Sequence, residues 1–242
     1  MIIGQSYAYN GKKFLTPYMA GTGVSFQADA NYTPPLWNLK AFNGSRLPEL
    51  YSKVEFPART GIYVLDMPIK MPGTDFRIPS NIEHYAPIIK KMVSIRSSDS
   101  YCYVTIDESG VSRNSGCHVD GFQGARIGAP LPTDYSFIAY SVGSTDFFRT
   151  NFKVHGLDRA KDNFFKEFDR QVSESDKVQY PANTIIGMDA YTVHRSARVQ
   201  GDRTFIRVSF SVREFDRLGN TLNPMFDYAW TMLPRDVSKC LI

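Results

Sequence analysis

The chain has few cysteines, and their arrangement excludes two classes of protein. Only three of its 242 residues are cysteine, and Cys102, Cys117 and Cys240 show no CxxC spacing. An odd number without paired spacing argues against a disulfide framework and against a cysteine-ligated zinc site. We therefore expect a protein of a reducing compartment, the cytoplasm.

Long apolar runs are also missing. The run around Ile62 to Met67 is far shorter than the roughly 20 residues that a membrane-spanning helix needs. The start of the sequence, MIIGQSYAYNGKK, lacks the order typical of an export signal, a basic start followed by an apolar stretch. We expect no association with a membrane.

The charge is not gathered into blocks, and no internal repeat or low-complexity stretch occurs. A formal charge of +4 and a pI near 8.9 would suit an anionic partner. Lys and Arg are scattered along the chain, however, which is typical of a solvated and mildly basic surface. Binding to nucleic acid is therefore an alternative that we do not favour.

The composition indicates one globular domain rich in aromatic residues. Hydrophobic residues make up 43% of the chain and aromatic residues 14%, which favours strands and a lined pocket. We expect a single domain over 1–242, with helices and loops of 1–99 packed on a core of 100–213 and a C-terminal extension of 214–242. The oligomeric state stays open.

Two segments predict helices. An amphipathic helix is expected around Pro87, which fits the first turn because it needs no N–H there. Its apolar positions include Ile88, Ile89, Met92 and Val93. The segment LDRAKDNFFKEFDRQV predicts a second helix with Asp158 as N-cap and an aromatic stripe that packs in the core. The stripe consists of Phe164, Phe165, Phe168 and Val172.

The second half of the chain predicts antiparallel β structure. Before Ser100 we expect irregular structure and one strand near Gly61 to Ile69. After Ser100, short segments rich in Tyr, Val, Ile, Thr and Phe recur between turn signals. They are YCYVTID, CHVDGF, YSFIAYSV, FKVHG, NTIIGMD, YTVHRSARV and RTFIRVSFSV. This pattern favours a mainly β fold with flanking helices, a jelly roll of the cupin-like kind, with a lipocalin-like barrel as the alternative.

Two of the four histidines lie in a context that indicates metal binding. His118 and Asp120 are two apart in GCHVDGFQG, so in an extended segment both side chains leave the same face. His194 lies in DAYTVHRSARV, a much later strand. Two imidazoles and one carboxylate form the facial triad of non-haem iron(II) oxygenases, which leaves positions open for a co-substrate and dioxygen. His84 and His155 are expected to be exposed or hydrogen-bonded locally.

The residues after His194 predict a carboxylate-binding site. Gly201-Asp202 is typical of a two-residue hairpin, which would place His194 opposite Ser209 and Arg207 on the same face, roughly 7 Å along the strand. A guanidinium can hold a carboxylate with two hydrogen bonds, and Ser209 can add a third. That arrangement suits a five-carbon dicarboxylate. The alternatives are a bulge that changes the counting and an Arg207 that only forms an ion pair.

Together these segments resemble a known family. GCHVDGF followed by TVHRSARVQGDRTFIRVSFS is similar to the HxD, distal-His and RxS signature of the iron(II)- and 2-oxoglutarate-dependent dioxygenases, over roughly Ser100 to Arg213. The resemblance implies a double-stranded β-helix, Fe(II) as cofactor and 2-oxoglutarate as co-substrate. It also implies that Thr145, in STDFF, and Tyr103 lie near the co-substrate. Because Asp120 stands where halogenating members have a small residue, we expect hydroxylation, or another oxidation such as desaturation or ring formation, over halogenation.

The substrate is less defined than the cofactor. The expectation is hydroxylation of an unactivated C–H of a small anionic or zwitterionic molecule, with formation of succinate and CO2. The residues considered for substrate contact are Tyr101, Gln123, Arg126 and Arg203. The alternatives are an oxygenase acting on a nucleobase or nucleotide, a non-catalytic jelly-roll binding protein and a cupin-like zinc or manganese enzyme. Iron-dependent binding of 2-oxoglutarate would separate the oxygenase from the binding protein.

Overall fold

The chain forms two compact units. The computed structural model describes residues 2–9, 12–19, 22–36, 38, 42, 46–110, 116–120, 134–158, 161–196, 201–212, 214 and 220–227. Unit 1 comprises Met1–Thr33, Glu55–Ser109 and Thr204–Ile242, and unit 2 comprises Pro34–Val54 and Gly110–Arg203. The single domain expected from the sequence, with its boundaries at 99 and 213, stays a prediction.

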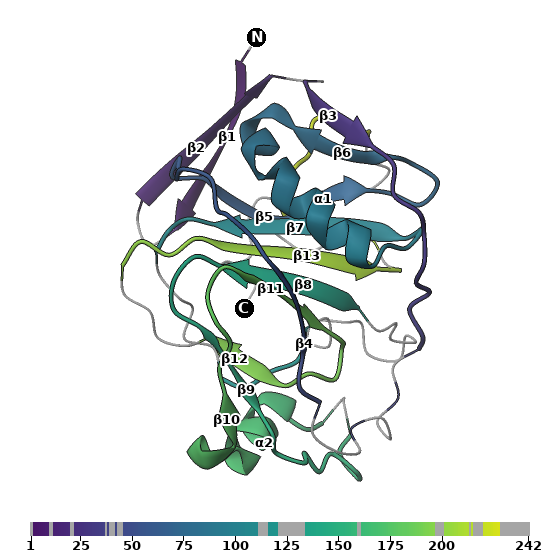
Figure 1. Ribbon diagram of the computed structural model, residues 1–242, viewed down its shortest axis with the longest axis vertical. Coiled ribbons are helices and arrows are strands. Elements are labelled where there is room, and N and C mark those ends of the chain that lie inside the picture. The colour runs from purple at the N-terminus through teal and green to yellow at the C-terminus, as the bar shows by residue number, and fades with distance from the viewer. Residues whose placement is uncertain are drawn as a thin grey trace. The chain divides into compact units, whose positions relative to one another are not determined.

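Unit 1 contains antiparallel strands and an α-helix (Figure 1). Its elements are β1 (Ile2–Tyr9), β2 (Lys12–Met19), β3 (Gly23–Phe26), β5 (Tyr63–Lys70), β6 (Phe76–Pro79), the 3-10 helix η2 (Ser80–Tyr85), α1 (Ala86–Ile95), β7 (Tyr101–Asp107) and β13 (Phe205–Ser211). β1 pairs with β2, β3 pairs with β6, and β7 lies between β5 and β13. The polar strand face described below belongs to β7 and β13.

Strands β7 and β13 separate apolar from polar side chains. Because side chains alternate along a strand, every second residue forms one face. One face of the pair is apolar and fully buried, and it consists of Cys102, Val104, Ile106, Ile206, Val208 and Phe210. The other face carries Tyr103 opposite Ser209 and Thr105 opposite Arg207. Helix α1 contacts β13, has Pro87 in its first turn and buries the four apolar positions that the sequence predicted.

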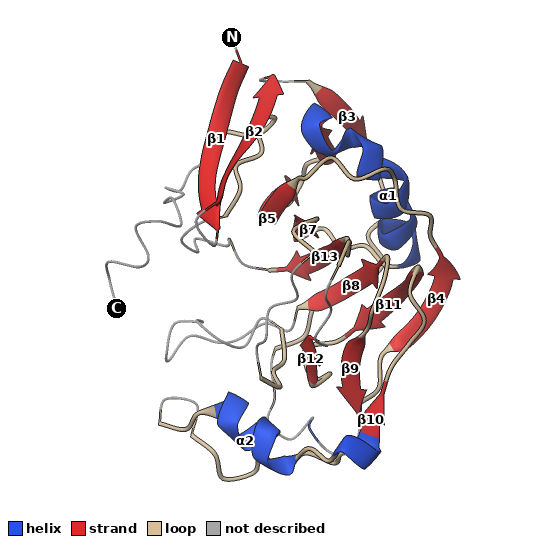
Figure 2. Cartoon of the chain, turned by 90° about the vertical axis from the view of Figure 1, so that its left-hand side faces the viewer, coloured by secondary structure: helices blue, strands red, loops and turns tan. Residues whose placement is uncertain are grey.

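Unit 2 also contains antiparallel strands and an α-helix. Its elements are β4 (Glu49–Lys53), β8 (Tyr135–Tyr140), β9 (Thr145–Phe148), α2 (Phe164–Gln171), the 3-10 helix η3 (Glu174–Asp176), β10 (Lys177–Val178), β11 (Thr184–Met188) and β12 (His194–Ser196). β11 lies between β4 and β8, and β9 lies between β10 and β12. Figure 2 shows β4, β11 and β8 side by side.

Helix α2 begins later than the sequence predicted. Its N-cap is Asn163, whose side-chain oxygen accepts a hydrogen bond from the Lys166 N–H at 3.2 Å. The expectation of Asp158 as N-cap is wrong because the Asp158 carbonyl accepts from Lys161 and Asp162 in a separate turn. The aromatic stripe packs as expected at Phe164 and Phe168, which are buried.

The mainly β fold predicted from the sequence is confirmed. Antiparallel strands dominate, and α1 and α2 are short; among the described residues no helix is long and apolar enough to cross a bilayer. The arrangement is consistent with a β-sandwich or jelly roll.

The segment before Ser100 contains more strands than the sequence predicted. In addition to the one predicted strand, β5, it forms β1 to β4 and β6. β3 and β4 are too short, and β4 too polar, to reveal a strand period.

The segment FKVHG is another difference, since it forms no strand. Phe152 and Val154 are buried in the unit 2 core, so their alternation reflects the packing of a loop and not a ladder of hydrogen bonds. The loop turns at Gly156, which has a φ of 86°. Such a left-handed conformation is accessible to glycine without steric cost.

Candidate metal centre

The three predicted metal ligands come together in unit 2. His118 and His194 face each other in an isolated antiparallel bridge, in which each N–H donates to the other's carbonyl at 2.9 Å. Their ring centroids are 4.4 Å apart. The Oδ1 atom of Asp120 lies 4.0 Å from Nε2 of His118 and 3.8 Å from Nε2 of His194. Two imidazoles and one carboxylate thus converge on one point.

This geometry fits a metal ion. One ligand atom from each of the three residues lies within 4.8 Å of the others. Bonds of about 2.1 Å bring neighbouring ligands to roughly 3 to 3.5 Å of one another, so closure by less than about 2 Å per pair is sufficient. Nitrogen and oxygen donors without thiolate suit a divalent first-row ion with open positions.

Hydrogen bonds to the backbone fix the tautomer of both rings. Nδ1 of His118 lies 2.9 Å from the carbonyl oxygen of Gly116, and Nδ1 of His194 lies 2.9 Å from that of Thr192. Because a carbonyl oxygen can only accept, each Nδ1 carries the proton. Each Nε2 therefore presents its lone pair to an ion, as in established histidine metal sites.

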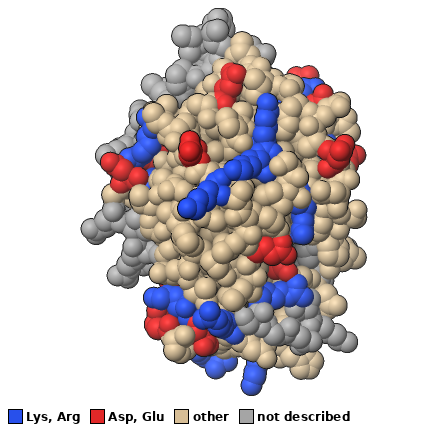
Figure 3. Space-filling model, viewed as in Figure 1, with Lys and Arg blue, Asp and Glu red and all other residues tan. Residues whose placement is uncertain are grey.

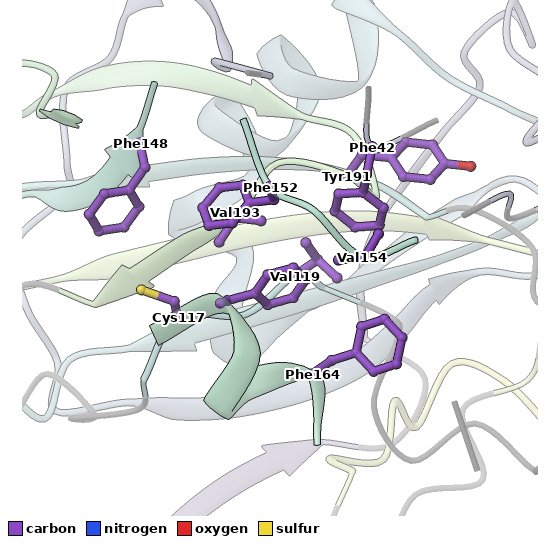
Figure 4. Packing of buried hydrophobic residues seen from close by; sticks show 10 residues of the cluster. Phe42, Cys117, Val119, Phe148, Phe152, Val154, Phe164, Tyr191 and Val193 are labelled. Carbon is purple, nitrogen blue, oxygen red and sulfur yellow. The ribbon is translucent and has the colours of Figure 1, made fainter. Parts of the chain in front are cut away.

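A buried cluster supports the site from the opposite strand face. Strand alternation predicts that Cys117 points away from the ligands, and it is fully buried beside Val119 and Val193 (Figure 4). Burial, followed by a hydrogen bond to Asp169, raises the pKa of the Cys117 thiol to about 12. The thiol belongs to the core, on the strand face opposite the three candidate ligands.

Aromatic rings flank the ligands, which remain partly open to solvent. Phe165 of α2 meets the His118 ring edge-on at 5.9 Å between centroids, and Phe147 lies 6.0 Å from the His194 ring. The exposed fraction of the side chain is 20% for His118, 16% for Asp120 and 9% for His194. The centre is thus packed against aromatic rings and partly exposed to solvent.

The turn before His194 is held by charged residues. Oδ1 of Asp189 accepts the Tyr191 N–H at 2.9 Å and the Thr192 hydroxyl at 3.0 Å, so this aspartate stabilises the turn. Arg46 donates to Oδ2 of Asp189 at 2.6 Å and stacks over the Tyr191 ring. This turn presents the Thr192 carbonyl to His194. No sequence pattern indicated Arg46, which lies 143 residues before Asp189 in the chain.

Strand β12 is also anchored on the face opposite His194. Arg195 donates to Asp146 at 3.0 Å and to Glu174 at 2.5 Å. Hydrogen bonds from Lys177 and Arg195 lower the pKa of Glu174 to about 2. These ion pairs stabilise the position of β12, the strand that carries His194.

Unit 1 brings four other predicted residues onto one strand face. They are Arg207 and Ser209 of β13 and Tyr101 and Tyr103 of β7. Arg207 donates from Nη2 to Oδ1 of Asp66 at 2.7 Å. The ion pair that the sequence left as an alternative therefore forms, although it is partly buried and not at the surface.

The predicted hairpin register is not the pairing that the strands show. His194 pairs with Phe147 of β9, and Ser209 pairs with Tyr103 of β7. The counting outward from Gly201 assumed that these strands pair with each other, whereas each uses an edge for another strand. The position of Arg207 relative to the metal ligands stays a prediction.

The remaining predicted residues have different outcomes. Thr145 is buried and pairs with Ser196, so it lies on the His194 face of the β9–β12 ladder, two residues from Phe147. Arg203 is buried with its guanidinium 5.6 Å from the Tyr140 ring centroid. Gln123 and Arg126 lie outside the described residues.

The other two histidines, His84 and His155, are not members of the candidate metal cluster. His84 belongs to η2 and packs against the Tyr85 ring, with 4.7 Å between the ring centroids, and His155 is exposed in a turn.

Comparison with models of protein families gave no match, and no curated protein matches the chain significantly.

Proposed function

We propose that this chain is a mononuclear non-haem iron(II) oxygenase that uses 2-oxoglutarate. The observation that carries the proposal is the convergence of His118, Asp120 and His194 on one face of a hydrogen-bonded bridge. Two imidazoles with a single carboxylate are the donor set of iron(II) oxygenases, which leave adjacent positions open. Iron bound there would supply the activation of dioxygen.

The residues around the ligands have a positioning task. Backbone carbonyls hold both Nδ1 protons, so the rings cannot rotate without breaking a hydrogen bond. Phe147 and Phe165 restrict the space beside the rings and keep it apolar. A catalytic constellation needs such support, because small displacements of a ligand cost activity.

The co-substrate proposal rests on the polar face of β7 and β13. Arg207, Ser209 and Tyr103 lie side by side there, and their guanidinium and hydroxyl groups suit a carboxylate. Asp66 accepts one of the five N–H donors that a guanidinium carries, and it fixes the plane of the group. We propose that this face binds the distal carboxylate of 2-oxoglutarate.

The proposed substrate is a small anionic or zwitterionic molecule that is hydroxylated at a C–H. Arg203 and Tyr101 are the described residues proposed for its recognition. On the face seen in Figure 3, basic and acidic side chains are interleaved, which is no support for the nucleic-acid alternative. We propose the cytoplasm as the location because the described cysteines, Cys102 and Cys117, are free and buried.

Turnover of 2-oxoglutarate tests the function. The protein is incubated with Fe(II), ascorbate, oxygen and 2-oxoglutarate, and succinate is quantified. We expect succinate from the wild type and from His155→Ala, which removes an exposed histidine, and none above background from Asp120→Ala. Equal succinate from Asp120→Ala and wild type would refute the proposal.

A further inference from the structure

A carboxylate outside the metal cluster is hydrogen-bonded to the peptide group that holds His118. Oδ1 of Asp169, in α2, accepts the backbone N–H of Cys117 at 2.8 Å. The carbonyl of the same peptide group is that of Gly116, and it accepts from Nδ1 of His118 at 2.9 Å. Asp169 and His118 thus bind opposite ends of one peptide group.

The close approach of Asp169 also explains a glycine. A Cβ at position 116 would overlap the Asp169 carboxylate, and Gly116 is not in a left-handed conformation. Glycine is therefore needed for space and not for backbone conformation. The packing of α2 is consistent with this, because Phe165, one turn earlier, contacts the His118 ring.

We infer that Asp169 is a positioning residue for the metal centre and acts on His118 through the Gly116–Cys117 peptide. This inference rests on the proposed function only in requiring that the cluster binds a metal. A negative charge at the N–H end of a peptide increases the electron density on its carbonyl, because hydrogen bonds in a chain polarise one another. The carbonyl then accepts more strongly from Nδ1, and Nε2 becomes a better donor to an ion.

The arrangement performs the task of a carboxylate bonded directly to a ligating histidine. In such sites the carboxylate fixes the ring and raises the basicity of the ligand. Here a peptide group is inserted between the two. His194 has a different support, since its acceptor is the Thr192 carbonyl and Asp189 binds the hydroxyl of Thr192. The two histidines should therefore respond differently to the loss of one charge.

Cobalt(II) binding to the full chain tests the inference, with Asp169→Asn as the main variant. Asp169 lies on the exposed side of α2, so the substitution spares the core. Glu167→Gln is the matched control, because it removes the same charge from the same helix, where Glu167 pairs with Arg170 at 2.8 Å. Cys117→Ala keeps the backbone N–H and removes only the thiol.

We expect the cobalt(II) dissociation constant of Asp169→Asn to rise about 10-fold, the lower end of the range for lost outer partners of metal ligands. Glu167→Gln and Cys117→Ala should stay within about twofold of wild type. In proton NMR of the cobalt(II) protein, the two histidine Nδ1–H protons give shifted, solvent-exchangeable resonances. One of them should move in Asp169→Asn while the other keeps its position.

Each outcome has a defined meaning. An unchanged dissociation constant with both resonances in place would overturn the role of Asp169 and leave the proposed metal centre intact. An equal loss of affinity in Glu167→Gln would reduce the effect to general charge and also overturn it. Circular dichroism identifies a misfolded Asp169→Asn, in which case Gly116→Ala, which displaces the same carboxylate, is expected to give the same 10-fold loss. No cobalt binding by the wild type would instead refute the metal centre itself.

Discussion

Arg207 and Asp66 form a partly buried ion pair, with Nη2 and Oδ1 separated by 2.7 Å. Asp66 adopts a φ of 42°, which is uncommon for a residue other than glycine. Its N–H donates to the Thr105 hydroxyl, which in turn donates to its carboxylate, both at 3.0 Å. The register of β5 against β7 shifts at this point. The Asp66 carboxylate thus both stabilises the distorted backbone of β5 at this residue and orients Arg207.

The Asp66–Arg207 pair should contribute measurably to stability. Arg207→Ala leaves a buried carboxylate without its cation, so the free energy of unfolding should fall by about 1–3 kcal/mol. In a double-mutant cycle with Asp66→Ala, the coupling energy should be about 0.5–3 kcal/mol. Urea unfolding of the four proteins measures it. Additive effects of the two substitutions would show that the pair is not stabilising.

Glu108 is a buried carboxylate at which even a conservative substitution should lower the free energy of unfolding. It is 2% exposed, and its Oε2 accepts the N–H groups of Thr60, Gly61 and Ile62. Glu108→Gln weakens these charge-assisted bonds, and we expect a loss of about 1–3 kcal/mol in unfolding free energy. The exposed Glu83→Gln serves as control and should stay within about 0.5 kcal/mol of wild type. Equal stability of the two variants in urea would contradict the account.

Because Tyr85 is buried, we expect the free energy of unfolding to decrease at alkaline pH. Burial, followed by the hydrogen bond to Glu108 and its charge, raises the pKa of Tyr85 well above its ordinary value of 10.0. Between the ordinary and the raised pKa the folded state binds more protons than the unfolded state, so stability decreases as pH rises above about 10 and is unaffected below. In Tyr85→Phe the decrease should be shallower. The same slope in both proteins, from urea unfolding at several pH values, would exclude Tyr85 as its cause.

Phe168 and Phe165 should separate packing from metal binding. Phe168 is fully buried in the unit 2 core, so Phe168→Ala should lower the unfolding free energy by about 3–5 kcal/mol. Phe165 is only partly buried and contacts the His118 ring, so Phe165→Ala should mainly weaken metal affinity. Thermal unfolding and cobalt(II) titration of both variants measure the two effects. A Phe165→Ala protein with wild-type metal affinity would remove this ring from the site.

The clustering of the candidate metal ligands could be predicted in part because the His118–Asp120 half of the cluster is local. HxD in an extended segment puts His118 and Asp120 on one face by the strand period alone. His194 could be assigned to the same cluster from its residue type, because the donor set requires a second imidazole. Strands β7, β11 and β13 could be predicted for the same reason, since their segments are locally rich in β-branched and aromatic residues.

Other features could not be predicted because they depend on contacts between distant segments. The partner strand of His194 is β9, and no local pattern indicates it. Asp169 and Arg46 support the centre from helix and loop positions where acidic and basic residues are common on any surface. The hairpin counting failed to give the register because it assumed pairing between neighbours in sequence, whereas Ser209 pairs with Tyr103.

The most direct test of the account is an anaerobic titration of the metal-free protein with Fe(II) and 2-oxoglutarate, followed by visible absorption. Chelation of the iron by the keto acid gives a weak charge-transfer band. We predict this band in the wild type, its loss in His194→Ala, and a requirement for far more 2-oxoglutarate in Arg207→Ala. No band in the wild type at any loading of Fe(II) and 2-oxoglutarate would contradict the central claim and favour the binding-protein alternative.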